Sequence, residues 1–116
     1  MNRTRIVAAL AALALAAVVP AQAAVPTLTG TVGPGFTISL KKAGVTVKTM
    51  KAGKVSLVVS DKSGIHNFHL TGPGVNVKTG VITQGTKTFA ITLKAGTYRY
   101  VCDPHATSMK GSFRVS

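Results

Sequence analysis

Residues 98–109 read Tyr-Arg-Tyr-Val-Cys-Asp-Pro-His-Ala-Thr-Ser-Met, a pattern that predicts a strand running into a loop. Successive side chains of a strand point to opposite faces, so Tyr98, Tyr100 and Cys102 should share one face while Arg99 takes the other. An arginine belongs on the solvent side. We therefore expect Cys102 to point inward at the end of this strand.

The same alternation of apolar and polar residues recurs upstream and downstream. The alternating runs are residues 36–40, 45–47, 55–59, 89–93 and 113–115. Turns containing Gly or Pro separate them, and no run of helical period lies between them. Short strands at this spacing predict an all-β, antiparallel sandwich or barrel of about seven or eight strands. Residues 72–85 are the least regular part.

The first 23 residues have a different character. Arg3 and Arg5 precede an unbroken apolar run over residues 6–19, and the small residues Ala21 and Ala23 follow. This order is typical of a secretory signal peptide, and the run is short for a membrane span. We predict a signal peptide at residues 1–23, a single domain at residues 24–116, and a periplasmic or extracellular location without membrane insertion. A retained membrane anchor is the alternative.

The charge is strongly one-sided. The chain has 14 Lys and Arg against 2 acidic residues, Asp61 and Asp103, and a formal net charge of +12. Such a surface attracts acidic partners, although lysines also keep a protein soluble and protect sheet edges. Except for Lys41 and Lys42 the lysines are scattered singly with no interleaved aromatic platform, so nucleic-acid binding is not indicated. No pattern indicates an obligate interface, and we expect a monomer.

Four residues suggest a metal site. Cys102, the single cysteine, is followed closely by His105 and Met109, with the rigid Pro104 between. His66 lies far upstream, on the same strand face as the apolar residues two and four positions later. Taken alone, each has an ordinary role: a buried cysteine, a turn histidine, a methionine filling a core gap. Together they predict metal binding.

The ligand types indicate the metal. Two imidazoles, one thiolate and one thioether are the ligand set of a type 1 copper ion. Structural zinc sites take four N or S ligands without methionine. A thiolate-bridged dinuclear copper centre needs two cysteines and a multicopper oxidase needs more than the 3 histidines present. Four protein ligands leave no open position for a substrate, so we do not expect an enzyme.

His69 offers a second imidazole close to His66. Strand alternation places it on the opposite face, which favours His66 as the ligand. A bulge in the strand would allow both to serve.

The pair His66-Asn67 and the run from Tyr98 to Phe113 resemble small bacterial cupredoxins of the plastocyanin/amicyanin type, from about residue 30 to the end of the chain. The resemblance implies a Greek-key β-sandwich that carries electrons between larger redox proteins. It also implies His66, Cys102 and His105 as copper ligands and Met109 as the axial one.

Further roles follow from the same resemblance. Asn67 would tie the ligand-bearing segments together by hydrogen bonds. The edge of His105 would be the electron port, within an apolar collar that includes Pro104 and Ala106. Two features depart from the family. Three residues separate His105 from Met109, where plastocyanins usually have four and amicyanins two, and Val101 replaces the aromatic residue that precedes the cysteine in plant plastocyanins.

We therefore predict an exported one-electron carrier with one type 1 copper ion, acting between redox partner proteins with acidic docking surfaces. A protein for copper delivery, storage or sensing is the alternative with the same ligands. A metal-free adhesion or scaffold domain, with Cys102 in its core, is the third.

Overall fold

The computed structural model describes residues 9, 11–18 and 24–116, and all the strands lie in the last range. The predicted signal peptide at residues 1–23 lies largely outside the described residues and stays a prediction. Within the described residues, no helix combines the length and the apolarity needed to cross a bilayer.

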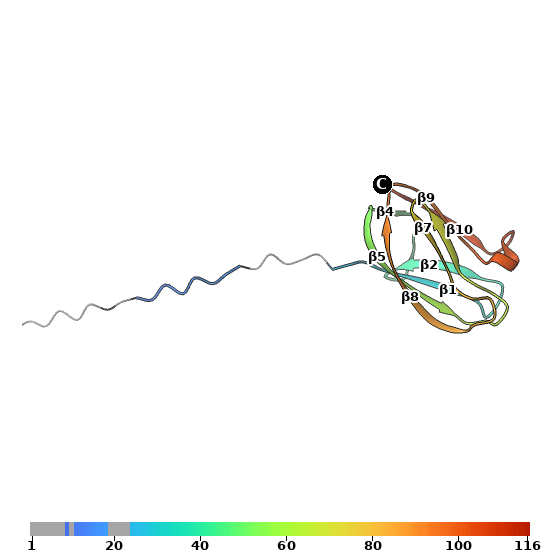
Figure 1. Cartoon of the computed structure of the whole chain (residues 1–116), viewed down its shortest axis with the longest axis horizontal. Helices are drawn as coiled ribbons and strands as arrows, with labels where there is room; N and C mark the ends of the chain where they lie inside the picture. The colour runs from blue at the N-terminus through green and yellow to red at the C-terminus, as the bar shows by residue number, and fades with distance from the viewer. Residues whose placement is uncertain (1–8, 10, 19–23) are drawn as a thin grey trace, which may run out of the picture.

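Residues 24–116 fold into two five-stranded sheets packed face to face (Figure 1). The first sheet has the order β3-β2-β1-β5-β8, with bounds β1 Thr27–Val32, β2 Ile38–Lys42, β3 Val45–Thr46, β5 Gly53–Asp61 and β8 Gly85–Leu93. The second has the order β4-β10-β9-β6-β7, with bounds β4 Thr49–Met50, β6 His69–Gly72, β7 Val75–Lys78, β9 Gly96–Val101 and β10 Lys110–Val115. A short 3-10 helix, η1, spans Asp103–His105 between β9 and β10.

The predicted β-sandwich is confirmed, but its details differ from the expectation. Two of the strand pairs are parallel, β1 with β5 and β4 with β10, so the sheets are mixed rather than antiparallel throughout. The strands also outnumber the seven or eight expected. One reason is that the chain changes sheets between Thr46 and Thr49, so that β4 follows the predicted run at residues 45–47 as an additional short strand.

The core lies between the two sheets and follows the alternation of the strands. In β9, Tyr98 and Tyr100 are buried, Arg99 is exposed, and Cys102 just beyond the strand is fully buried. The predicted facing of this strand is therefore confirmed. Burial of such a contiguous apolar cluster is the main force that holds two sheets together.

Two tyrosines of β9 pack directly against glycines of neighbouring strands. A Cβ atom placed on Gly111 would lie 2.2 Å from the Tyr100 ring, and one placed on Gly72 would lie 2.2 Å from the Tyr98 ring. The Tyr100 ring also stacks on Phe68, with a centroid distance of 5.5 Å. Glycine is required at both positions because the rings leave no room for a side chain.

The domain has two ends, which we define by the strands that begin and finish at each. At one, β5 and β9 end while β6 and β10 begin; the loops between them contain His66 and the run from Cys102 to Met109. We call this the site end. At the other, the basal end, β1 and β5 begin and β10 ends. Figure 1 shows the start of β1 and the C-terminus at the basal end and η1 at the opposite side.

Candidate metal centre

Three side-chain atoms converge at the site end. Nδ1 of His66 and Nδ1 of His105 are 3.1 Å apart, and Sγ of Cys102 lies 3.7 Å from the former and 3.6 Å from the latter. By geometry, the point equidistant from the three atoms is about 2.0 Å from each, near the ~2.0–2.3 Å of metal–nitrogen and metal–thiolate bonds. The donor atoms therefore fit one small metal ion.

The loop from Cys102 to Met109 is closed by its own backbone. The Cys102 N–H donates to the Met109 carbonyl over 3.0 Å, and the Met109 N–H donates to the His105 carbonyl over 2.8 Å. Pro104 lies at the start of η1, where its missing N–H is not needed. Cys102 and Met109 are almost completely buried, whereas His105 is partly exposed. The sequence-predicted Cys102, His105 and Met109 thus lie in one compact loop.

His66 reaches the cluster by a different route from the predicted one. It is fully buried, as expected, but the segment around it is not part of a strand, because β6 begins only at His69. Asn67, which alternation placed on the opposite face, is buried as well. Its backbone N–H donates to Sγ of Cys102 over 3.4 Å. This segment bonds to the Cys102 loop and to Thr79 instead of pairing with a neighbouring strand. Its side chains therefore do not alternate between two faces, and the prediction of a strand here is wrong.

The Asn67 side chain joins three segments. Its Nδ2 donates to the Thr79 carbonyl over 3.3 Å and to Oδ2 of Asp103 over 2.7 Å, and its Oδ1 accepts the Asp103 N–H over 2.7 Å. Asn67 therefore ties the His66 segment to the residue that follows Cys102. This bears out the bridging role that the resemblance implied.

His69 is not in the cluster. Its Nδ1 donates to Oδ1 of Asp103 over 2.8 Å, and its Nε2 lies 2.7 Å from Oδ1 of Asn76. Burial acts to raise the pKa of Asp103, but the hydrogen bonds from Asn67 and His69 outweigh it and bring that pKa below its ordinary value. An ionised Asp103 is thereby stabilised beside the Cys102 loop. Because His69 bonds to Asp103 and Asn76, the strand bulge that would let both His66 and His69 bind the metal does not occur.

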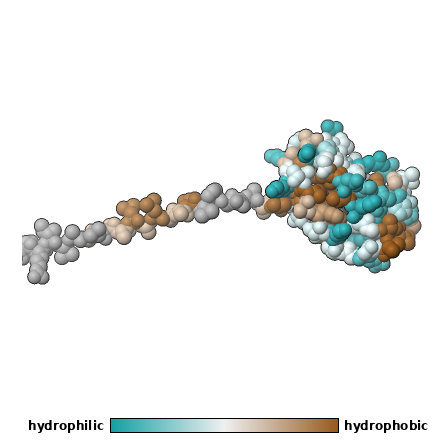
Figure 2. All heavy atoms as spheres, viewed as in Figure 1, coloured by the Kyte–Doolittle hydropathy of each residue, from teal (hydrophilic) through white to brown (hydrophobic). Residues whose placement is uncertain are grey.

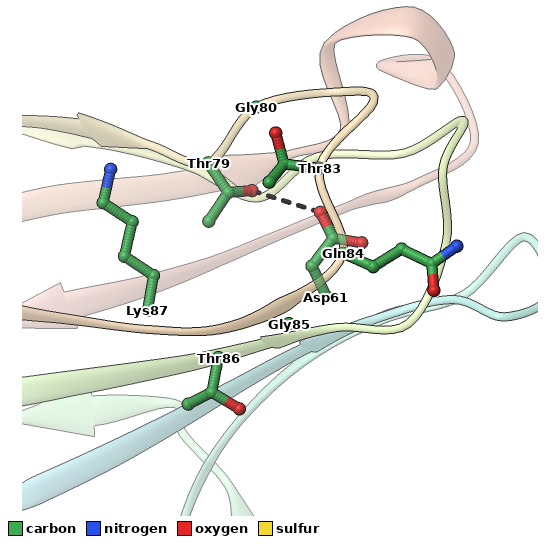
Figure 3. A pocket seen from close by; sticks show the side chains of 8 residues that line it. All are labelled: Asp61, Thr79, Gly80, Thr83, Gln84, Gly85, Thr86 and Lys87. Carbon is green, nitrogen blue, oxygen red and sulfur yellow. Dashed lines mark hydrogen bonds between the residues drawn. The ribbon is translucent and has the colours of Figure 1, made fainter.

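A buried carboxylate braces the loop that leads to His66. Oδ1 of Asp61 accepts the Ser63 N–H over 3.1 Å, and the Thr79 hydroxyl donates to Oδ2 over 3.5 Å. Figure 3 shows the hydrogen bond between Thr79 and Asp61, with the side chains of Thr83 and Gln84 beside it. These four residues line a cavity of about 210 Å³. Burial raises the pKa of Asp61, with the bonds from Ser63 and Thr79 opposing the rise.

Phe36 is a contact that the sequence did not suggest. We expected it within a half-buried strand, but β2 begins at Ile38 and Phe36 is 62% exposed. Its ring meets the rings of His66 and His105 edge-on, with centroid distances of 5.0 and 4.9 Å. The one sequence signal was the Gly- and Pro-rich turn immediately before Phe36, which favours a later start of the following strand.

Apolar residues are exposed or partly exposed at the site end near His105, and Phe36 contacts its ring. Phe36 and Ile65 are exposed at the site end, Pro104 is exposed, and Ala106 is partly buried. Figure 2 shows hydrophobic surface on this side of the domain. The Phe36 contact adds an apolar neighbour of His105 that the resemblance did not imply, and the collar formed by Pro104 and Ala106 stays a prediction.

The comparisons with known proteins agree with this geometry. A family model described as copper binding proteins of the plastocyanin/azurin family matches residues 31–116. The chain belongs to this family. No curated protein matches the chain closely enough to count as a relative.

Solved structures of rusticyanin are similar to this cupredoxin. A structure of reduced rusticyanin has 25% sequence identity and a TM-score of 0.59, with 78% of each chain covered. A structure of rusticyanin from Thiobacillus ferrooxidans has 26% identity and a TM-score of 0.54, covering 78% of this chain and 76% of that chain.

Family and geometry together define the site. This cupredoxin brings together two imidazoles and one thiolate, with a buried methionine in the same loop, a donor set consistent with one type 1 copper ion. The metal-free scaffold hypothesis does not agree with this membership. Cupredoxins are typically non-enzymatic electron carriers and have redox partners in general.

Proposed function

We propose that this cupredoxin is a one-electron carrier in which His66, Cys102 and His105 bind a single copper ion and Met109 is a weak fourth ligand. When bound, copper supplies the one-electron change between Cu(II) and Cu(I). The observation that carries the proposal is the set of distances of 3.1, 3.6 and 3.7 Å among the three donor atoms. These distances match the spacing that one copper ion requires.

A rigid donor set suits electron transfer, because little rearrangement then accompanies the change of charge. Cys102 and Met109 are joined by a backbone hydrogen bond, and Asn67 links the His66 segment to Asp103. The Asn67 N–H that points at Sγ of Cys102 would also tune the potential, since hydrogen bonds to a ligating sulfur do so.

We infer that electrons enter and leave at His105. It is partly exposed, whereas His66 and Cys102 are fully buried. Phe36 and the neighbouring apolar residues offer a dry contact surface for a partner. The basic surface would steer acidic redox partners into a brief encounter that weakens as salt is added.

Export completes the proposal. The basic start, apolar middle and small-residue end of residues 1–23 support removal of a leader and release of the domain outside the cytoplasm, in the periplasm or the extracellular space. N-terminal sequencing of the protein recovered from the producing cells tests this: a start at Ala24 supports it, and a start at Met1 contradicts it.

Titration of the metal-free protein with Cu(II) tests the copper site. We expect one equivalent to bind with an intense blue thiolate-to-copper absorption band. Cys102→Ser should abolish the band, whereas His69→Gln should keep it, because His69 bonds to Asp103 and Asn76 outside the cluster. A blue band that survives Cys102→Ser, or that His69→Gln removes, would contradict the ligand assignment.

Electrochemistry separates electron transfer from copper delivery. A carrier should give a reversible one-electron wave, fast self-exchange, and copper that a chelator removes slowly. A colourless protein that releases Cu(I) readily to a chelator would favour delivery or storage instead.

A further inference from the structure

Three rings pack against one another at the metal centre. The centroid distances are 5.0 Å between Phe36 and His66, 4.9 Å between Phe36 and His105, and 4.8 Å between the two imidazoles. The interplanar angles are 73°, 83° and 75°, so every pair meets edge-on, an arrangement that aromatic rings favour. Each metal-binding imidazole therefore has the Phe36 ring as a direct neighbour.

The plane of the His66 ring is not fixed by a hydrogen bond. A metal-binding histidine usually donates the N–H of its second ring nitrogen to a carboxylate, a carbonyl or water, and this bond orients the ring. Nδ1 of His66 faces the other donor atoms, which leaves Nε2 for such a bond. Nε2 is buried, and no group within the described residues accepts a hydrogen bond from it. The orientation of this ring therefore depends on packing.

The loop that carries Phe36 is held close to His66. The Gly33 N–H donates to the Thr37 carbonyl over 2.9 Å, which closes the loop at its base. A Cβ atom placed on Gly33 would lie 2.8 Å from Cβ of Ser63 and 3.4 Å from Cδ2 of His66. The backbone of the loop thus approaches the His66 segment so closely that only glycine fits, and this approach fixes the position of Phe36.

Phe36 contributes little to the core of the domain. Its side chain is 62% exposed, and it lies outside the apolar cluster that the two sheets enclose. The ring contacts of Phe36 are with the two imidazoles. Replacing Phe36 should therefore change the metal centre while leaving the fold intact.

We propose that Phe36 is a positioning residue of the metal centre. Its ring blocks rotation of His66 and His105 about their Cβ–Cγ bonds and so keeps the two Nδ1 atoms 3.1 Å apart before a metal binds. A side chain that is ordered in advance adds no ordering cost when the metal arrives. The inference rests on the proposed function and deepens it, because ligand rings held by the protein rearrange little when the charge of the ion changes.

Nuclear magnetic resonance of the metal-free protein tests the positioning directly. In wild type, the ring protons of the two imidazoles should show nuclear Overhauser effects to each other and to the Phe36 ring. Phe36→Leu keeps an apolar side chain but removes the planar ring, and it should lose the effect between the imidazoles. Phe36→Tyr keeps the ring and should retain that effect. Ile82→Ala is the matched control, because Ile82 is an apolar residue that is 88% exposed in the loop before β8, also at the site end.

Copper binding gives a second readout, which a merely structural role of Phe36 would not change. Each side chain that must be ordered on binding lowers affinity roughly two- to twelvefold. Competition for Cu(II) with a chelator should therefore show about tenfold weaker binding in Phe36→Leu. Phe36→Tyr and Ile82→Ala should bind as wild type does. The copper hyperfine splitting in electron paramagnetic resonance should change in Phe36→Leu alone, because only this variant frees the imidazole planes.

Three results would overturn the proposal: Overhauser effects and affinities in Phe36→Leu equal to those of wild type, a loss in Phe36→Tyr as large as in Phe36→Leu, or an equal loss in Ile82→Ala. A wild-type protein that binds no copper would contradict the proposed function instead, and the Overhauser effects in the metal-free protein would still decide the role of Phe36. Urea unfolding midpoints equal to wild type establish that the variants fold.

Discussion

Removing the side chain of Asn67 should destabilise the protein far more than its size suggests. Asn67→Ala deletes three hydrogen bonds, one to the Thr79 carbonyl and two to Asp103. Thr79 is only 6% exposed, so water cannot easily replace the lost partner of its carbonyl, whereas Asp103 is more exposed. Each bond contributes roughly 1 kcal/mol net and a stranded buried group costs about 1–3 kcal/mol. We expect the free energy of unfolding to fall by about 3–5 kcal/mol.

Equilibrium urea unfolding of the metal-free protein measures this loss. Asn76→Ala is the matched control, since Asn76 is exposed and contacts His69 only at the edge of the same network. It should cost below about 1 kcal/mol, as exposed contacts usually do. If Asn67→Ala costs no more than Asn76→Ala, the bridge does not hold the two segments together, and the account of how His66 is placed is wrong.

Three further changes test other parts of the structure by urea unfolding. Gly111→Ala should cost at least about 1–3 kcal/mol, because the new Cβ meets the Tyr100 ring at 2.2 Å; no loss would refute that contact. Met109→Ala should cost about 2–5 kcal/mol in the metal-free protein, since Met109 is 1% exposed; a loss well under this range would mean that Met109 does not fill the core. Burial raises the pKa of Asp61 above its ordinary 3.8, so the folded state favours the protonated carboxyl and stability falls as the pH rises through that range. Asp61→Asn should therefore gain stability relative to wild type between pH 3 and pH 7, and an unchanged difference at the two pH values would contradict it.

The part of the site that depends on local sequence could be predicted closely. Alternation around Arg99 places Cys102 inward, and the short distance to Met109 makes one loop of the sulfur-bearing residues. The sandwich itself also follows from the alternating runs and their turns. These features depend on contacts between residues close in the sequence, and strand periodicity describes such contacts well.

The remaining features depend on contacts between distant segments. The Asn67 side chain bonds to Asp103, 36 positions away in the sequence. Phe36 lies outside its expected strand and contacts the imidazoles of His66 and His105. The division of residues 45–50 between two sheets likewise depends on pairing with β2 and β10. No local period encodes these partners, so tertiary contacts override the pattern at each of them.

The contacts between tyrosine rings and glycines restrict how this fold can evolve. At Gly111 and Gly72 any larger residue meets a ring that the core itself needs. A lineage that enlarges the glycine first meets the ring, and one that first shrinks Tyr100 or Tyr98 leaves a cavity in the core. Either single change is destabilising while the two together can compensate, so the two members of each pair are epistatic and change most easily together.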